Sequence, residues 1–572
     1  VAELTRAIFE ELREHDHLQR ADQAEAGASK VAPGACLICL SRLALVCRQF
    51  LEPALDLLWE KQSGLEHLLK CLPTHTWISS HKFEVIIQSP VNQRARDRLF
   101  FYAKRVRILI STRGGVLHES VLETLSIWGR QGVLLPNVHK VLCETGSPFF
   151  PFIPSLVGRT VTKLHIRSPS GPVRRLMALP SIAAQCPDLS ILRIGVVPND
   201  ANEWISGFIL SLPRLRSLYI AAWRNMTETI FRRLLDLKSL QTLQINSMAS
   251  PTVPQLDHNP MKDGPEEFTA LRYLSFSAPT TDVALRFVGL VPMAPLETLS
   301  IQTVQTSRQA NIKMLCLRIA IGQTLAQLTS ISLSFGELPP NAVKKITGNA
   351  IQPLLALNHL RLVDLSFPFD PALDDRFFEG LGQSWPSLQS LSIGGTDPLD
   401  TESASYACIM CLLPLSRCCP DLRYIKISLD ASAAPLNSNA RLPRTIQTVL
   451  KTWDVSHSPI ASAHEVAAFI SSILYSFAQF VCHASQAPKF TKIFVPVTGH
   501  LGFLRIPKIS HKFCQKAPKS QKILPVRPWS CRALILASAV CAVSKKGRLD
   551  VIECSRHSSG QENSAFCAPS HR

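Results

Sequence analysis

The sequence predicts an α/β fold in which a short helical module precedes a long stack of strand–helix units with parallel strands. Three observations support this prediction. Up to about residue 60 the apolar residues fall at helical spacing, and from residue 161 a short apolar triplet recurs every 25 to 34 residues. Several copies of the triplet also follow a proline at a fixed offset. A chain of 572 residues with 46% hydrophobic content can bury a large core.

The N-terminal segment predicts three helices. The first has apolar residues on one face, with an aromatic residue beside them: Leu4, Ile8, Leu12 and Phe9. The second carries an apolar stripe at i, i+3, i+4 and i+7: Leu43, Val46, Cys47 and Phe50. Proline is tolerated in a first helical turn, so Pro53 is expected to begin the third helix, which includes Leu58 and Trp59.

This arrangement resembles the F-box, in particular that of fungal F-box proteins, where Cys-Arg-x-Phe is followed by Glu-Pro-Ala-Leu-Asp-Leu-Leu-Trp. The resemblance implies a three-helix domain within residues 1–75 that binds the Skp1 adaptor of a cullin-RING ubiquitin ligase. It also implies the adaptor contacts: Leu4, Ile8, Phe9, Leu12, Leu43, Val46, Cys47, Phe50, Leu58 and Trp59. The chain departs from the family pattern because no Leu-Pro opens it and because residues 19–39 form an atypical insert with the composition of a loop.

The middle of the chain, residues 76–477, predicts a solenoid of repeats. The recurring pattern is an apolar residue, two others, an apolar residue, one other and a last apolar residue. Ten copies begin at Val161, Leu189, Leu215, Leu240, Leu271, Leu296, Leu328, Leu360, Leu388 and Leu422, and a weaker copy begins at Val138. Pattern and spacing are typical of leucine-rich repeats, whose strands line a concave face and whose helices lie on the convex face.

The C-terminal part of the sequence predicts the end of this array and a basic tail. Ser462 and Glu465 form a capping box before an apolar stripe, so a helix over 462–477 is expected to cover the last repeat. Residues 478–572 hold 15 of the 61 Lys and Arg residues but only three of the 43 acidic ones. The excess positive charge therefore lies mainly in a segment expected to be poorly folded, which does not favour a nucleic-acid-binding face.

The sequence predicts no enzyme, cofactor or metal site. It lacks the glycine-rich phosphate and dinucleotide loops and the His-Glu-x-x-His and Gly-x-Ser-x-Gly motifs. The pairs Cys36/Cys39 and Cys408/Cys411 are too far apart for a zinc site, so we expect Cys408, Cys411, Cys418 and Cys419 to be buried as small apolar residues. No apolar run reaches 18 residues and the 17 cysteines are scattered, which favours the cytoplasm or nucleus and no membrane partner.

The predicted function is therefore binding. The concave face is expected to hold a protein partner through Arg193, Arg216, Tyr219, Arg272, Tyr273, Arg361, Arg423 and Tyr424. Their charge favours an acidic or phosphorylated partner. With the F-box resemblance, this predicts a substrate-recognition subunit of a Skp1–cullin–F-box (SCF) ubiquitin ligase. The alternative is a leucine-rich-repeat scaffold unrelated to ubiquitination, in which the N-terminal helices only cap the solenoid.

Overall fold

The structure is a computed structural model, whose contacts divide the chain into two units, residues 1–512 and 513–572. The described residues all belong to the first unit: 3, 7, 9–11, 35–79, 85–111, 118–130, 132–147, 149–167, 173–223, 226–235, 237–247, 270–291, 295–306, 309–322, 328–337, 346–397, 407–432, 449–455, 458, 469 and 479–481. Most of the expected insert at 19–39, and all of the expected tail except 479–481, lie outside them.

The N-terminal module contains helices α2 (Ala35–Val46) and α3 (Arg48–Glu60), together with helical residues around Phe9. The predicted second helix through Leu43 and Phe50 is wrong, because Cys47 has extended backbone angles and separates α2 from α3. Consequently α3 begins at Arg48 and contains Pro53 in its interior instead of beginning there. The tolerance of proline in a first helical turn therefore did not predict where α3 begins.

The module has a small core of its own. Phe9, Leu40, Ala54 and Leu57 are buried together, and the rings of Phe9 and Phe50 meet edge to face with centroids 5.6 Å apart. Edge-to-face contact is a favoured aromatic geometry, which fixes the turn around Phe9 against α2 and α3. This core is separate from the continuous core of the repeats.

Within the described residues, the repeat array forms one sheet of fifteen strands, each paired in parallel with the next strand of the sheet along the chain. The strands are β1 (Lys61–Gln62), β4 (Ile108–Ser111), β5 (Lys140–Cys143), β6 (Lys163–Ile166), β7 (Ile191–Val197), β8 (Ser217–Trp223), β9 (Thr242–Ile245), β10 (Tyr273–Thr280), β11 (Thr298–Gln305), β12 (Ser330–Ser334), β13 (Leu362–Phe369), β14 (Ser390–Asp397), β15 (Tyr424–Ile427), β16 (Thr452–Asp454) and β17 (Gln479–Val481). A separate antiparallel pair is formed by β2 (Trp77–Ile78) and β3 (Ile86–Ile87).

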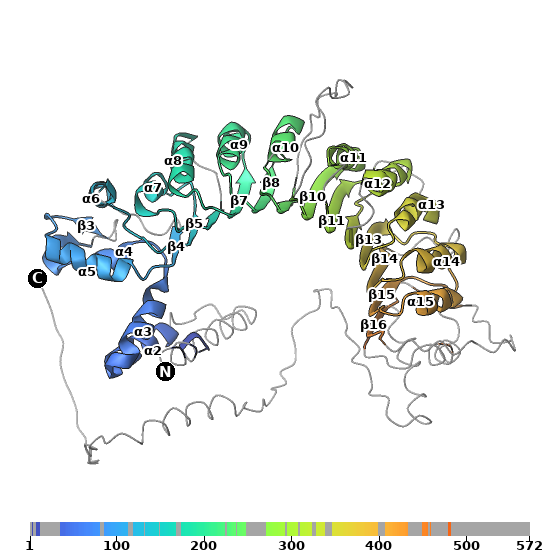
Figure 1. Ribbon diagram of the computed structural model, residues 1–572, viewed down its shortest axis with the longest axis horizontal. Helices are drawn as coiled ribbons and strands as arrows, with labels where there is room; N and C mark the ends of the chain where they lie inside the picture. The colour runs from blue at the N-terminus through green and yellow to red at the C-terminus, as the bar shows by residue number, and fades with distance from the viewer. Residues whose placement is uncertain are drawn as a thin grey trace, which may run out of the picture. The chain divides into compact units, whose positions relative to one another are not determined.

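In the described part of the chain, helices lie between most pairs of successive strands and along one side of the sheet, whose opposite side we call the open face (Figure 1). The α-helices are α4 (Glu66–Leu69), α5 (Gln93–Ala103), α6 (Glu119–Arg130), α7 (Ile153–Leu156), α8 (Ala178–Gln185), α9 (Asn202–Leu210), α10 (Glu228–Leu235), α11 (Thr281–Gly289), α12 (Gln309–Gly322), α13 (Gly348–Ile351), α14 (Asp375–Ser384) and α15 (Leu412–Cys418). Short 3₁₀ helices are η1 (Thr74–Thr76), η2 (Phe150–Phe152), η3 (Val173–Met177), η4 (Asn199–Ala201), η5 (Gln352–Ala356) and η6 (Ile409–Cys411). The structure is therefore a mixed α/β solenoid with parallel strands, as the sequence predicts.

The apolar triplets form the core between strands and helices. Every residue of the eleven predicted triplets is at most 4% exposed. One unit cannot bury this face alone, so each depends on the units stacked against it. The prolines also behave as expected: Cys186, Trp385 and Cys419 precede proline and leave helical geometry at the ends of α8, α14 and α15.

The array contains units beyond the eleven predicted triplets, and its strands pass the predicted bounds 76–477 at both ends, with β1 before and β17 after them. Strand β4 belongs to a triplet of Val106, Leu109 and Ser111. This triplet did not match the apolar pattern because its third residue is polar. Strand β16 belongs to a triplet of Leu450, Trp453 and Val455, all at most 2% exposed. Strand β17 pairs with β16 beyond the expected end at residue 477. Of the expected covering helix over 462–477 only Phe469 is described, and it is helical and buried.

Candidate docking surfaces

Helix α2 leaves large apolar side chains outside the core of the module. Leu45 is 85% exposed, Val46 65%, Leu37 51% and Ile38 50%. They lie on both sides of the segment that packs in the module, where Leu40 is buried and Leu43 and Ala44 are partly buried. Contiguous exposed apolar surface usually marks an interaction site. Sequence reasoning selected only Val46 of these four, although α2 is apolar apart from Ser41 and Arg42, which was a signal that it presents apolar residues on most sides.

The predicted adaptor contacts separate into several groups. Leu4, Ile8 and Leu12 lie outside the described residues. Phe9 is buried, and Leu43, Phe50 and Leu58 pack partly buried against it, whereas Val46 and Cys47 are exposed. Trp59 packs against the repeat core, with its ring 4.8 Å from that of Tyr102 in α5. The exposed members therefore lie around the end of α2, while Trp59 belongs to the junction with the repeats.

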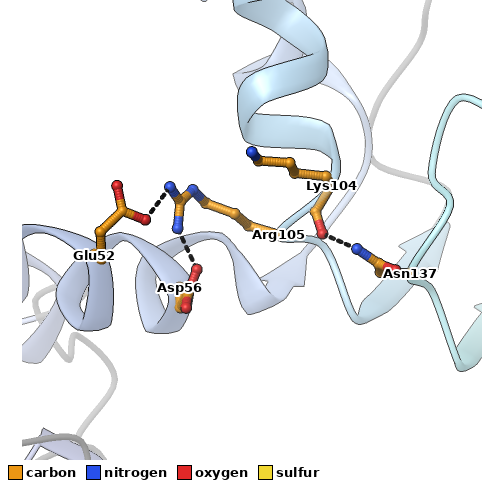
Figure 2. A network of polar contacts seen from close by, with 5 residues as sticks. All are labelled: Glu52, Asp56, Lys104, Arg105 and Asn137. Carbon is orange, nitrogen blue, oxygen red and sulfur yellow. Dashed lines mark hydrogen bonds and ion pairs between the residues drawn. The ribbon is translucent and has the colours of Figure 1, made fainter. Parts of the chain in front are cut away.

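An ion-pair network joins α3 to the first repeats. Arg105, which follows α5, donates to Glu52 at 2.6 Å and to Asp56, both on α3 (Figure 2). The side chain of Arg105 is 5% exposed, whereas those of Glu52 and Asp56 are 61% and 46% exposed. Burial alone would lower the pKa of the Arg105 guanidinium, but the hydrogen bonds that it donates to Glu52 and Asp56, with the charges of those carboxylates, outweigh burial and raise the pKa.

The same network contains backbone and aromatic contacts. Asn137 donates its side-chain amide to the carbonyl oxygen of Lys104 at 2.6 Å, which ties the end of α5 to the segment before β5 (Figure 2). The Arg105 guanidinium also lies 4.7 Å from the ring centroid of Phe101. One side of α3 thus faces the repeats, and it carries Glu52, Asp56 and Trp59 at positions i, i+4 and i+7. Sequence reasoning missed Arg105, because its acidic partners lie about fifty residues away.

On the open face, alternate strand residues point away from the buried ones, and the register aligns them in rows. One row runs through His165, Arg193, Tyr219 and Gln244 on β6 to β9. The Arg193 guanidinium lies 4.8 Å from the ring centroid of Tyr219. Of the residues predicted to bind substrate, Arg193, Tyr219, Tyr273 and Tyr424 are strand residues of this face.

The other four predicted residues lie at the edge of the sheet. Arg216, Arg272, Arg361 and Arg423 each stand one residue before a strand and are exposed. Backbone hydrogen bonds align this edge, since Gln241 donates to the carbonyl of Arg216 at 2.8 Å and Arg272 to that of Gln241 at 2.9 Å. Arg272 also forms an exposed ion pair with Glu297, which offsets its charge. Each of these four residues directly follows the first apolar residue of its triplet. This position could have distinguished them from the strand residues in the sequence.

Burial suppresses the reactivity of several of the described cysteines. Burial raises the pKa of Cys316 and Cys419 to about 12 and that of Cys186 to about 11, which suppresses the thiolate. Cys411 and Cys419 are buried, while Cys408 and Cys418 are partly buried. Among the described residues no three His, Cys, Asp or Glu side chains are grouped to hold a metal ion. None of the described helices has the length and apolar character needed to cross a membrane.

Comparison with known proteins gives little. No model of a protein family and no curated protein matches the chain. Among solved structures the chain is similar to one in the crystal structure of the Rad7 and Elc1 complex in yeast, with 12% sequence identity and a TM-score of 0.32. That similarity covers 68% of this chain and 89% of the other.

Proposed function

We propose that the protein is the substrate-recognition subunit of an SCF-type ubiquitin ligase, with a non-catalytic role. The N-terminal module would bind a Skp1-like adaptor, and through it a cullin, while the open face of the repeats holds a protein substrate. Ubiquitin transfer would then depend on holding the substrate near the conjugating enzyme.

One observation carries the proposal. The module has its own core, yet Leu37, Ile38, Leu45 and Val46 on α2 lie outside it and are at least half exposed. They adjoin the motif that resembles the F-box, whose role is adaptor binding. A partner that covers such a surface gains about 25 cal/mol of binding free energy per Å² of apolar area removed from water.

The test is adaptor capture. Leu45→Glu combined with Val46→Glu should abolish co-purification with co-expressed fungal Skp1, because two carboxylates would be buried at the interface. The matched control is Ile127→Glu with Ile321→Glu, since these residues of α6 and α12 are 57% and 71% exposed. The control should retain Skp1, and both pairs should unfold like the wild type. Undiminished capture by the α2 pair would refute the adaptor role of this surface.

A second candidate is a repeat scaffold whose N-terminal helices only cap the solenoid. The junction favours it, since Glu52, Asp56 and Trp59 all face the repeats. It predicts that the wild-type chain captures no Skp1, so the same experiment separates the two functions.

A further inference from the structure

Strands β5 to β7 carry a cluster of basic residues on the open face. Lys140 and Lys163 are register partners on β5 and β6, and His165 and Arg193 are register partners on β6 and β7. Lys163 and Arg193 are exposed, whereas Lys140 and His165 are partly exposed. We call these four residues the basic cluster. Only Arg193 was selected from the sequence, although Lys140 and Lys163 occupy the same position of consecutive triplets.

Folding does not account for this arrangement. Like charges directly opposite on neighbouring strands are destabilising. Across the neighbouring strands, the other register partners of the cluster are Ile108, Ile191, Leu142 and Tyr219, none of which is acidic. Within the described part of the chain, no carboxylate forms an ion pair with Lys140, Lys163 or Arg193.

The electrostatic fields of these residues overlap. The pKa of His165 is lowered by burial and by the charges of Arg167, Arg193 and Lys140. The pKa of His139, at the start of β5, is lowered by burial and by Lys163, Arg107 and Lys140, against an opposing effect of Glu60. The side chains are therefore close enough to act together on one anion.

Further along the array the open face is different. The row of the basic cluster continues through Ser275, Ser300 and Ser332 on β10 to β12. The adjacent row carries Thr298 and Ser330 on the same strands. These side chains are uncharged hydroxyls, which donate to and accept from a peptide backbone without a charge requirement. Among the described open-face strand residues, the other Lys and Arg residues are Lys61 on β1 and Lys426 on β15, so only β5 to β7 group basic residues on neighbouring strands.

We propose that the basic cluster binds the negatively charged part of an extended protein segment, whose uncharged part lies toward the hydroxyl-lined strands. The charge is supplied by clustered carboxylates or by phosphate, since both accept charge-assisted hydrogen bonds from Lys and Arg. Strands are spaced about 4.8 Å apart, so the cluster spans roughly 10 Å, which suits a short charged segment. A single-stranded nucleic acid instead needs a basic groove that follows its backbone. Identification of this segment as substrate rests on the function proposed above.

Binding can be measured with the full chain and labelled probes. The probes are a short glutamate oligomer, a Gly-Ser peptide carrying phosphoserines, the same peptide without phosphate, and a single-stranded oligonucleotide. The cluster variant combines Lys140→Gln, Lys163→Gln and Arg193→Gln. Its control combines Arg233→Gln, Lys313→Gln and Arg376→Gln, which removes the same charge from exposed residues of α10, α12 and α14. Both variants keep the basic segment 478–572, so it contributes equally.

The cluster variant should bind the acidic peptides about 10- to 100-fold more weakly than the wild type, and the control should stay within about threefold. Preference for the phosphorylated peptide identifies phosphate as the source of charge, and equal binding of the glutamate oligomer identifies carboxylates. The proposal is overturned if no acidic peptide binds, if both variants weaken binding equally or not at all, or if only the oligonucleotide depends on the cluster. Skp1 capture, measured on the same variants, reports separately on the adaptor role.

Discussion

The N-terminal module and the repeat array use their apolar residues in opposite ways. In the array the triplets are buried on one continuous core, so stability accumulates from unit to unit. In the module four buried residues form the core, and α2 keeps Leu45 and Val46 exposed. The difference indicates that the triplet residues of the array serve folding, whereas Leu45 and Val46 do not. The array also exposes single apolar residues such as Ile127 and Ile321, but α2 exposes four within ten residues.

The largest effect should come from the array core. Leu299 is 1% exposed and lies between register partners Leu274 and Ile331. Leu299→Ala should lower the free energy of unfolding by about 3 kcal/mol, because it leaves a cavity that the stacked strands cannot close. Leu45→Ala, at an exposed position, should change it by less than about 0.5 kcal/mol. Urea unfolding measures both, and equal losses would contradict the contrast between the two regions.

This contrast also explains what the sequence revealed. The array was predictable because every unit must bury the same three apolar positions. The triplet Leu189, Leu192 and Ile194 therefore predicts a strand, and the other copies of the triplet support that prediction. Strand β4 escaped because Ser111 is buried in place of an apolar residue. The module was less predictable, since one copy offers no comparison: nothing local marked the extended backbone at Cys47 or the contact of Trp59 with Tyr102.

The candidate sites were only partly predictable for a similar reason. The pairing of Arg105 with Glu52 and Asp56 joins distant segments, and its presence depends on how α3 meets the repeats. The basic cluster became visible only with the register, which places Lys140 opposite Lys163. Periodicity in the sequence shows which residues are buried. Which exposed residues lie next to one another on a surface depends on how neighbouring strands are aligned.

The junction between the two regions should give the next largest effect. Glu52→Gln combined with Asp56→Asn leaves the buried guanidinium of Arg105 without a counter-charge, at a cost of about 1 to 3 kcal/mol given that both carboxylates are partly solvated. Arg105→Met, which removes the buried charge as well, should cost less. The control is Arg214→Met, whose pair with Asp188 is exposed and should matter by less than about 1 kcal/mol. Thermal unfolding measures all three, and a harmless double substitution would show that the junction does not depend on this network.

The C-terminal end of the array should give a smaller effect. A chain truncated after Val481 keeps β17 and should unfold like the full chain. Truncation after Ala478 removes the strand whose Phe480 is the register partner of the buried Trp453, so about 1 kcal/mol should be lost. The two truncations differ by three residues and are compared by urea unfolding. A large loss already in the longer chain would mean that residues beyond 481 belong to the folded array.

The smallest effect concerns pH and tests whether the folded array loses stability when His139 and His165 are protonated. Because the pKa values of His139 and His165 are lowered from 6.5 in the folded chain, the unfolded chain binds more protons just below that pH. Stability from these groups is therefore complete above pH 6.5 and is lost as the pH falls toward their folded values. His139→Gln with His165→Gln should flatten this part of the stability profile, whereas the exposed pair His67→Gln with His75→Gln should leave it unchanged. An unchanged profile in the first pair would mean that neither burial nor the nearby cations lower the pKa values of the two histidines. An acidic peptide bound at the cluster should reduce the loss at low pH, because its charge favours the protonated histidines.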